Sequence, residues 1–228
     1  MNYPLHRDRR SSHRTIARLV AALGVSPILD VGAAEGSLAR LLRGRSLTLD
    51  AVEPDADWAA AAAPLYRRVY AEAVETAALP ARTYRAVVCA DVLEHTADPV
   101  GVLRQLREAA TEDARFVISV PNVAHAAARA LLLIGQFPQA ERGIFDRTHL
   151  HFYTRGTALD MIRAAGLEPV AIETTPVPLE HLWPSALGGT LLEAAMRLQQ
   201  LAIRLAPRLF SFQWIVVAEA REPGRPRA

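Results

Sequence analysis

Residues 143–154, GIFDRTHLHFYT, gather reactive side chains in one short stretch. The groups there that can exchange protons or bind a metal ion are Asp146, His149, His151 and Tyr153. Imidazole titrates near neutral pH and is a common metal ligand. If the stretch is extended, His149 and His151 share one face. We expect this stretch to contact a substrate, with His149 the first candidate and His151 the second.

A second pair of such residues, Glu94 and His95, lies in the segment VLEHT. This segment follows an apolar run of strand length, so it belongs at the end of a strand. A carboxylate next to an imidazole is suited to general acid–base work. The alternative is a hydrogen-bonded turn with a purely structural role.

Segments of strand and helix character alternate along the chain, which predicts an α/β fold with a mostly parallel sheet and helices on both faces. The expected strands are residues 27–34, 46–54, 67–75, 84–93, 114–122, 168–176 and 212–220. The expected helices are residues 11–24, 37–43, 55–62, 99–110, 154–167 and 186–206. We expect one domain over residues 1–228, with a covering helix at 11–24, a ligand-binding half at 27–122, an insertion at 123–153 and further helices and strands at 154–220.

The ends of the first two strands carry a nucleoside-binding pattern. Small residues in DVGAAEG, residues 30–36, allow the backbone to turn tightly beside a ligand. Glu53 ends the next strand and can accept hydrogen bonds from ribose hydroxyls. The spacing G-x-A-x-G differs from the dinucleotide pattern G-x-G-x-x-G, which disfavours a nicotinamide oxidoreductase. Asp30 disfavours pyrophosphate and suits a cationic ligand.

These motifs resemble those of the class I S-adenosylmethionine-dependent methyltransferases. The resemblance lies in ILDVGAAEG, DAVEPD, YAEAVETAALP, VVCADVLEHTADP and FVISVPN, in order within about residues 25–175. It implies a Rossmann-like, seven-stranded, mostly parallel sheet with S-adenosylmethionine as cofactor. The cofactor-binding residues it implies are Asp30, Gly32, Ala34 and Gly36 in the first loop, Glu53 and Pro54 at the ribose, Glu72 and Ala73 beside the adenine, and Asp91 and Val92 below the sulfonium. Ala34 stands where the family usually has glycine, and we expect it to be tolerated with a negative φ.

The resemblance also implies that residues 123–153, inserted after the fifth strand, form a lid over the acceptor. This lid is similar to those of bacterial methyltransferases that act on glycans and quinone-type small molecules. The implied acceptor is a small molecule, most favourably a hydroxyl of a sugar or glycan precursor or of a phenolic or quinone-like metabolite. The expected catalytic residues are His149, His95, Glu94, His151 and Asp146.

Three roles stay open for these histidines: metal-free base catalysis, metal binding and a structural role. Asp91, Glu94, His95 and His149 are similar in spacing to the metal ligands of the small-RNA 2′-O-methyltransferases, and such a set could hold a divalent ion. The short side chain of Asp91 makes the metal-bound form the less favoured one. An RNA 2′-O-methyltransferase and a non-catalytic cofactor-binding protein are the alternative functions.

Composition excludes or disfavours several classes of function and partner. The net charge of +2 and 6% aromatic residues argue against a nucleic-acid partner. The chain contains no lysine, which excludes Schiff-base chemistry and a P-loop. Its one cysteine, Cys89, lies in an apolar run and is expected to be buried. No apolar run reaches the length of a membrane span. We expect a cytoplasmic monomer or homodimer.

The segment 186–206 carries apolar residues at positions 191, 194, 198, 201 and 205. This spacing predicts an amphipathic helix. Packing on the domain is the favoured interpretation, and a dimer seam or peripheral membrane contact are the alternatives.

Overall fold

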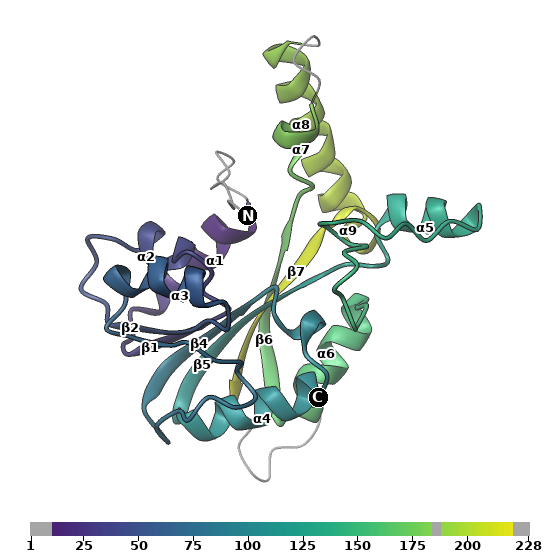
Figure 1. The fold of residues 1–228 in the computed structure, drawn as a ribbon. Helices are drawn as coiled ribbons and strands as arrows, with labels where there is room; N and C mark the ends of the chain where they lie inside the picture. Colours follow the sequence, from purple (N-terminus) through teal and green to yellow (C-terminus); the bar gives the residue numbers. More distant parts are fainter. Residues whose placement is uncertain (1–10, 184–187, 221–228) are drawn as a thin grey trace.

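The computed structural model describes residues 11–183 and 188–220. Its centre is a seven-stranded sheet in the order β3-β2-β1-β4-β5-β7-β6 (Figure 1). The strands are β1 (Ile28–Val31), β2 (Leu49–Val52), β3 (Arg68–Tyr70), β4 (Tyr84–Ala90), β5 (Ala110–Pro121), β6 (Leu167–Thr175) and β7 (Gln213–Ala220). Only β7 runs antiparallel to its neighbours, β5 and β6. The mostly parallel sheet predicted from the sequence is confirmed.

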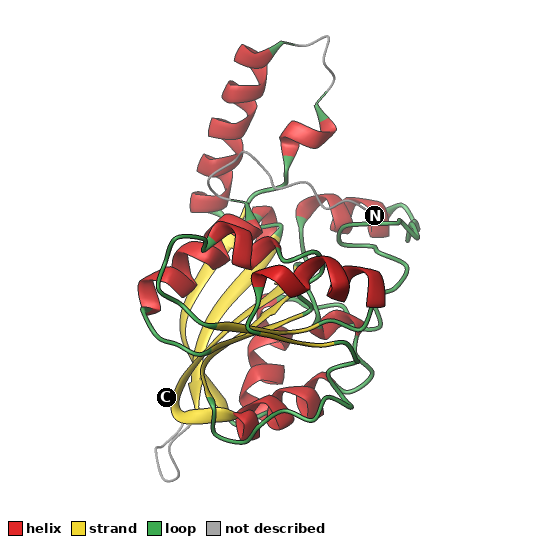
Figure 2. Ribbon diagram, turned by 60° about the vertical axis from the view of Figure 1, so that its left-hand side comes forward, coloured by secondary structure: helices red, strands yellow, loops and turns green. Residues whose placement is uncertain are grey.

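Helices cover both faces of this sheet, as expected, with α1, α2 and α3 on one side and α4 and α6 on the other (Figures 1 and 2). The helices are α1 (Ser12–Leu23), α2 (Ser37–Leu41), α3 (Ala56–Ala62), α4 (Pro99–Ala109), α5 (Ala126–Leu133), α6 (Arg155–Ala164), α7 (Leu179–Leu182), α8 (Gly189–Leu205) and α9 (Pro207–Phe210). Two 3₁₀ turns, η1 (Ala63–Leu65) and η2 (Leu93–His95), complete the elements.

Alternate residues of the central strands build two separate cores. Leu29 and Val87 pack with Leu106 of α4 on one face. Ile28 and Val88 pack with Val20 of α1 on the other. Strands buried on both faces read as continuous apolar runs, which is why these strands could be found in the sequence. Cys89 lies in the first core and is fully buried, as predicted.

Helix boundaries follow local side-chain chemistry. Thr154 and Thr157 form a reciprocal capping box that begins α6. Asp98 accepts from the N–H of Gly101 at the start of α4, where Pro99 takes the first helical position. Gly166, with φ +77°, follows the last turn of α6 and stops it, as the sequence predicts.

From its sequence we favoured packing of helix α8 on the domain, and this prediction is wrong. None of its residues is buried, and it projects from the sheet in both views (Figures 1 and 2). The large side chains on its exposed surface are Leu191, Leu198, Leu201 and Leu205. Of the first three residues predicted for this helix, 186 and 187 are outside the described part of the chain, and Gly188 is the N-cap. Within the described residues, no helix is both long and apolar enough to cross a membrane.

Asn122 ties the insertion at 123–153 to the sheet. Its buried side chain donates to the carbonyls of Ser211 (2.8 Å) and Arg208 (3.3 Å) and accepts from the N–H of Ala124 (3.1 Å). Its backbone pairs with Tyr153, so both ends of the insertion meet at this residue.

We predict that Asn122→Ala lowers the free energy of unfolding by about 2 kcal/mol, because two carbonyls lose their donor inside the protein. Asn122→Asp keeps the acceptor but not the donor, so it should be at least as destabilising. Urea denaturation of both variants checks this. Changes below about 0.5 kcal/mol, the range of ordinary surface substitutions, would show that the insertion is held elsewhere.

Candidate functional site

A cavity of about 600 Å³ opens at the carboxyl ends of the central strands. One part of its wall is the loop after β1, together with Glu53, Pro54 and Ala73. Another part is formed by His95, Asp146 and Thr148. A single cavity therefore joins the predicted nucleoside-binding motif to the predicted reactive stretch. Its size is in the usual range for small-molecule sites.

The loop after β1 needs its two glycines for different reasons. A Cβ on Gly32, with φ +73°, would lie 2.5 Å from Cγ2 of Val92, across the cavity floor. A Cβ on Gly36, with φ +86°, would lie 2.6 Å from Cδ1 of Leu65. Gly36 is not part of the cavity wall; it shapes the loop by allowing α2 to pack close to η1.

Ala34 has φ +47°, so the expectation of a negative φ is wrong. Its N–H donates to Oε2 of Glu53 at 2.7 Å. The backbone at Ala34 is therefore in the left-handed region, which alanine adopts only with strain, and its N–H is bonded in that conformation.

Glu53 is buried at the end of β2 and is oriented by backbone donors. Besides Ala34, the N–H of Asp55 donates to its Oε1 at 3.0 Å. Each oxygen keeps a further lone pair, and the side chain forms part of the cavity wall. This is the arrangement that a pair of vicinal hydroxyls requires.

Asp30 carries a carboxylate into the same cavity and is buried. Burial raises its pKa to about 7, a hydrogen bond from the Tyr66 hydroxyl (2.5 Å) opposes this, and the charge of Glu53 adds to the rise. A cation placed beside this carboxyl group would stabilise its ionised form.

Asp91 is already satisfied within the protein. Its Oδ1 accepts from the hydroxyl of Ser119 and its Oδ2 from Nε2 of Gln213, both at 2.7 Å. Its φ of +56° turns the backbone at the end of β4 toward the cavity. Its oxygens are not among the ligand-type atoms that gather at Glu94, His95 and His149, so the four-ligand metal set suggested by the sequence loses its first member.

The remaining predicted binding residues fall into two groups. Pro54, Ala73 and Val92 belong to the cavity wall, whereas Glu72 does not, and Glu75 stands there instead. His13 of α1 and Trp58 of α3 also belong to the wall and were not predicted. No spacing signal relates His13 to the strand ends; only the packing of α1 brings it there.

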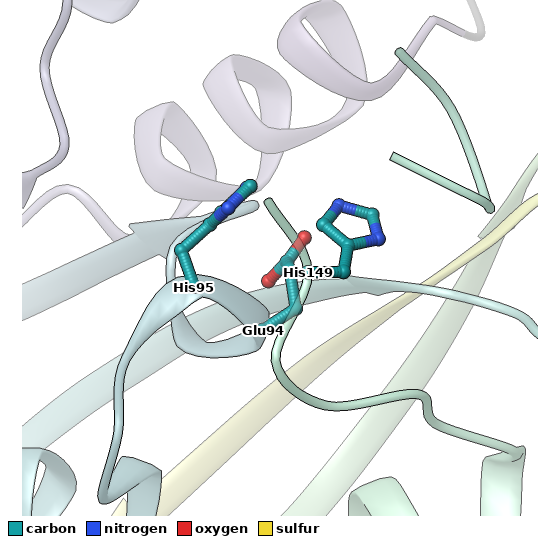
Figure 3. Close-up of side chains that lie close together, drawn as sticks. All are labelled: Glu94, His95 and His149. Carbon is teal, nitrogen blue, oxygen red and sulfur yellow. The ribbon is translucent and has the colours of Figure 1, made fainter. Parts of the chain in front are cut away.

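Glu94, His95 and His149 converge beside the cavity, with ligand-type atoms within 4.8 Å of one another. The Glu94 carboxylate lies between the two rings in Figure 3, and the imidazole centroids are 4.8 Å apart. Glu94 is fully buried. Burial raises its pKa well above the ordinary value, and the charges of Asp91 and Asp146 add to the rise.

Hydrogen bonds fix both imidazoles through Nδ1. In His149 this atom lies 3.2 Å from the carbonyl of Ile144, and in His95 it lies 3.3 Å from the carbonyl of Thr148. Both carbonyls can only accept, so Nδ1 carries the proton and Nε2 keeps its lone pair. Burial lowers the pKa of His149, and the neighbouring His95 lowers it further. His149 is therefore neutral at physiological pH.

Asp146 supports this cluster from behind. It accepts from the hydroxyl (2.6 Å) and the N–H (2.8 Å) of Thr148, whose hydroxyl oxygen lies 3.1 Å from Nδ1 of His95. Partial burial raises the pKa of Asp146, but these hydrogen bonds outweigh burial and hold it below its usual value.

His151 lies apart from the cluster. Its Nε2 is 3.4 Å from the carbonyl of Ala97, and its ring stacks on Tyr153. The stretch turns at residues 146–149, where the N–H of His149 donates to the carbonyl of Asp146. The alternation expected for an extended segment therefore does not apply, and the two histidines do not act on one point.

The sequence matches a known protein family, and the fold matches those of known proteins. A family model described as a methyltransferase domain matches residues 5–172, most of the chain. The chain belongs to the class I S-adenosylmethionine-dependent methyltransferases. No curated protein sequence matches it.

Solved structures of methyltransferases share the fold at low identity. A 1,6-didemethyltoxoflavin-N1-methyltransferase from Burkholderia thailandensis, with bound S-adenosylhomocysteine, is 17% identical, with TM-score 0.61, over 93% of this chain and 80% of that one. A magnesium protoporphyrin IX methyltransferase from Synechocystis PCC 6803 is 14% identical, with TM-score 0.62, over 94% and 84%. An S-adenosylmethionine-dependent methyltransferase from Archaeoglobus fulgidus is 18% identical, with TM-score 0.61, over 91% and 94%.

The cofactor of this methyltransferase is S-adenosylmethionine. The cavity fits that molecule because Glu53 offers lone pairs for two ribose hydroxyls, Gly32 leaves room where a Cβ would touch Val92, and Asp30 suits the ammonium group. We expect Pro54, Ala73 and Trp58 to flank the nucleoside, and Asp91 and Val92 to flank the sulfonium.

We predict that S-adenosylmethionine binds roughly tenfold more tightly at pH 8 than at pH 6, since the cation pairs with ionised Asp30 and that carboxyl must lose its proton first. The free protein holds the proton below its raised pKa of about 7, so affinity falls as pH falls. Calorimetry across this range measures the effect. Asp30→Asn is the matched control, because the ligand's own titration is unchanged; it should bind more weakly and show a smaller pH dependence. Equal pH profiles for the two proteins would remove Asp30 from this role.

We predict that Ala34→Gly raises the free energy of unfolding by about 0.5–1 kcal/mol, because glycine adopts a positive φ without strain. Ala33→Gly is the control, since Ala33 is buried and is not among the described residues with positive φ. It should lower stability by a similar amount. Urea denaturation of both variants measures this, and equal destabilisation by both would contradict the strain at Ala34.

Proposed function

We propose that this methyltransferase transfers a methyl group to a hydroxyl of a small molecule, with a sugar or glycan precursor, or a phenolic or quinone-like metabolite, as the acceptor class. The observation that carries the proposal is the shared cavity, which has Asp30 and Glu53 in one part of its wall and His95 in another. The neutral imidazole of His149 lies next to that of His95, with the ring centroids 4.8 Å apart.

The cofactor and the protein's residues have different roles in the reaction. S-adenosylmethionine supplies an activated methyl group that is transferred by in-line displacement. The protein's task is to orient the acceptor oxygen and take up its proton. Asp30 and Glu53 bind the cofactor, and Glu94, His95 and His149 act on the acceptor. Asp146 positions His95 through Thr148.

Two of the solved neighbours act on small molecules, which is consistent with a small-molecule acceptor for this protein. The Burkholderia enzyme acts on 1,6-didemethyltoxoflavin and the Synechocystis enzyme on magnesium protoporphyrin IX. An RNA acceptor is less well supported, because the chain has a net charge of only +2. A cytoplasmic monomer or homodimer without a nucleic-acid partner is part of this proposal. The exposed leucines of α8 are the surface through which a second copy or a membrane would be contacted.

The test is a screen of hydroxylated acceptors for S-adenosylhomocysteine release, with calorimetry of S-adenosylmethionine against NAD. We expect turnover with at least one member of these classes and no NAD binding. Release only with RNA, or tighter binding of NAD, would contradict the proposal.

Two variants separate binding from chemistry. Glu53→Ala should weaken cofactor binding by 10-fold or more, since a charged acceptor of hydrogen bonds is worth about 1.5–3 kcal/mol. His149→Ala should lower kcat about 100-fold or more with cofactor affinity nearly unchanged. Calorimetry and initial rates on both proteins decide. Loss of cofactor binding in His149→Ala would make His149 a structural residue.

A further inference from the structure

We propose that Glu94, His95 and His149 bind a divalent first-row transition ion, which holds the acceptor oxygen. This inference rests on the proposed function and names how the cluster acts. Three atoms within 4.8 Å of one another lie within about 2.8 Å of a common centre. A shift of less than about 1 Å brings them to the 2.0–2.2 Å that Zn²⁺ takes from histidine and carboxylate ligands.

The buried carboxylate of Glu94 is the first argument for an ion. Glu94 is fully buried, and neither of its oxygens has a hydrogen-bond partner in the described part of the chain. Protonation alone would leave a buried O–H donor and an acceptor without partners. Unpaired groups of this kind are costly inside a protein. A cation between Glu94 and the two rings, toward which the carboxylate points in Figure 3, removes the cost.

The orientation of the imidazoles is the second argument. Both rings are anchored through Nδ1 to backbone carbonyls, so each presents the lone pair of Nε2. For His95 the anchor extends through the Thr148 hydroxyl to Asp146. Ligating histidines are held in this way by partners behind the ring, which fix the tautomer and orient the lone pair.

The donor set selects the kind of ion. Two imidazole nitrogens and one carboxylate oxygen suit Mn²⁺, Fe²⁺, Co²⁺ or Zn²⁺, whereas Mg²⁺ prefers oxygen ligands alone. Asp91 is not one of the three residues whose ligand-type atoms lie close together; its carboxylate is held instead by Ser119 and Gln213. Three protein ligands leave coordination positions open, as catalytic sites do.

The open positions explain how a hydroxyl would be activated. Coordination would lower the pKa of the hydroxyl, so its proton would pass to solvent, and the two imidazoles would act as ligands and not as the base that takes it up. The oxygen lone pair then forms the bond to the methyl carbon. The bond between that carbon and the sulfonium sulfur breaks with its electron pair kept by sulfur, leaving a neutral thioether.

The test is direct metal binding by the full, tag-free chain, without an acceptor. Chelator-treated protein is titrated with Mn²⁺, Co²⁺, Zn²⁺ and Mg²⁺ by calorimetry, and bound metal is counted by mass spectrometry. We expect one transition ion per chain and far weaker binding of Mg²⁺. Glu94→Gln should weaken binding more than about 100-fold, since loss of an outer partner alone costs about 10–100-fold. His151→Ala is the matched control and should bind like the native protein.

Two further readouts keep the outcomes distinct. Glu94→Gln should melt close to the native protein in chelator, because it exchanges a buried carboxyl group without hydrogen-bond partners for an amide of the same size, and its affinity for S-adenosylmethionine should not change. Absence of saturable binding by the native chain, or equal binding by Glu94→Gln, overturns the ion site. Full turnover in chelator also overturns it and leaves the proposed function standing, with His149 as a metal-free base. Metal binding as expected, with no acceptor turned over, supports the ion site and contradicts the proposed function.

Discussion

The backbone carbonyl of Glu94 accepts hydrogen bonds from the N–H groups of Leu150 (2.8 Å) and His151 (3.2 Å). This contact holds residues 144–151 against the turn that follows β4. It buries the Glu94 carboxylate beneath the segment that supplies His149. Without it, His95 and His149, which are distant in sequence, would not face each other. The acceptor half of the site depends on this pairing.

The cofactor half depends on the order of the sheet. Strand β1 lies between β2 and β4, and the chain leaves β1 and β4 toward opposite faces. A crevice at such a point is where α/β proteins bind ligands. Asp91 turns the end of β4 into this crevice, and Ser119 of β5 and Gln213 of β7 hold it there. The floor of the cavity is thus tied to three adjacent strands.

Much of this architecture could be predicted from short-range patterns. The central strands β1, β2 and β4 were visible because they are buried on both faces. Glu53 was found because it follows the glycine loop by a regular strand–helix–strand interval. Long-range packing was not accessible. The partners of Asp91 lie 28 and 122 residues away, so its exclusion as a metal ligand could not be anticipated. The positive φ of Ala34 goes together with a hydrogen bond to Glu53, 19 residues away, which no local pattern indicates. The exposure of α8 was missed because helical periodicity does not reveal what, if anything, covers the apolar stripe.

Together, the cofactor half and the acceptor half of the site imply one mechanism. The methyl group of the cofactor is presented to the cluster of Glu94, His95 and His149. A crystal structure with S-adenosylhomocysteine tests it most directly. We expect the ribose hydroxyls on Glu53 and the thioether sulfur beside Asp91 and Val92, facing His95. A sulfur atom turned away from the cluster, or a nucleoside bound outside this cavity, would contradict it.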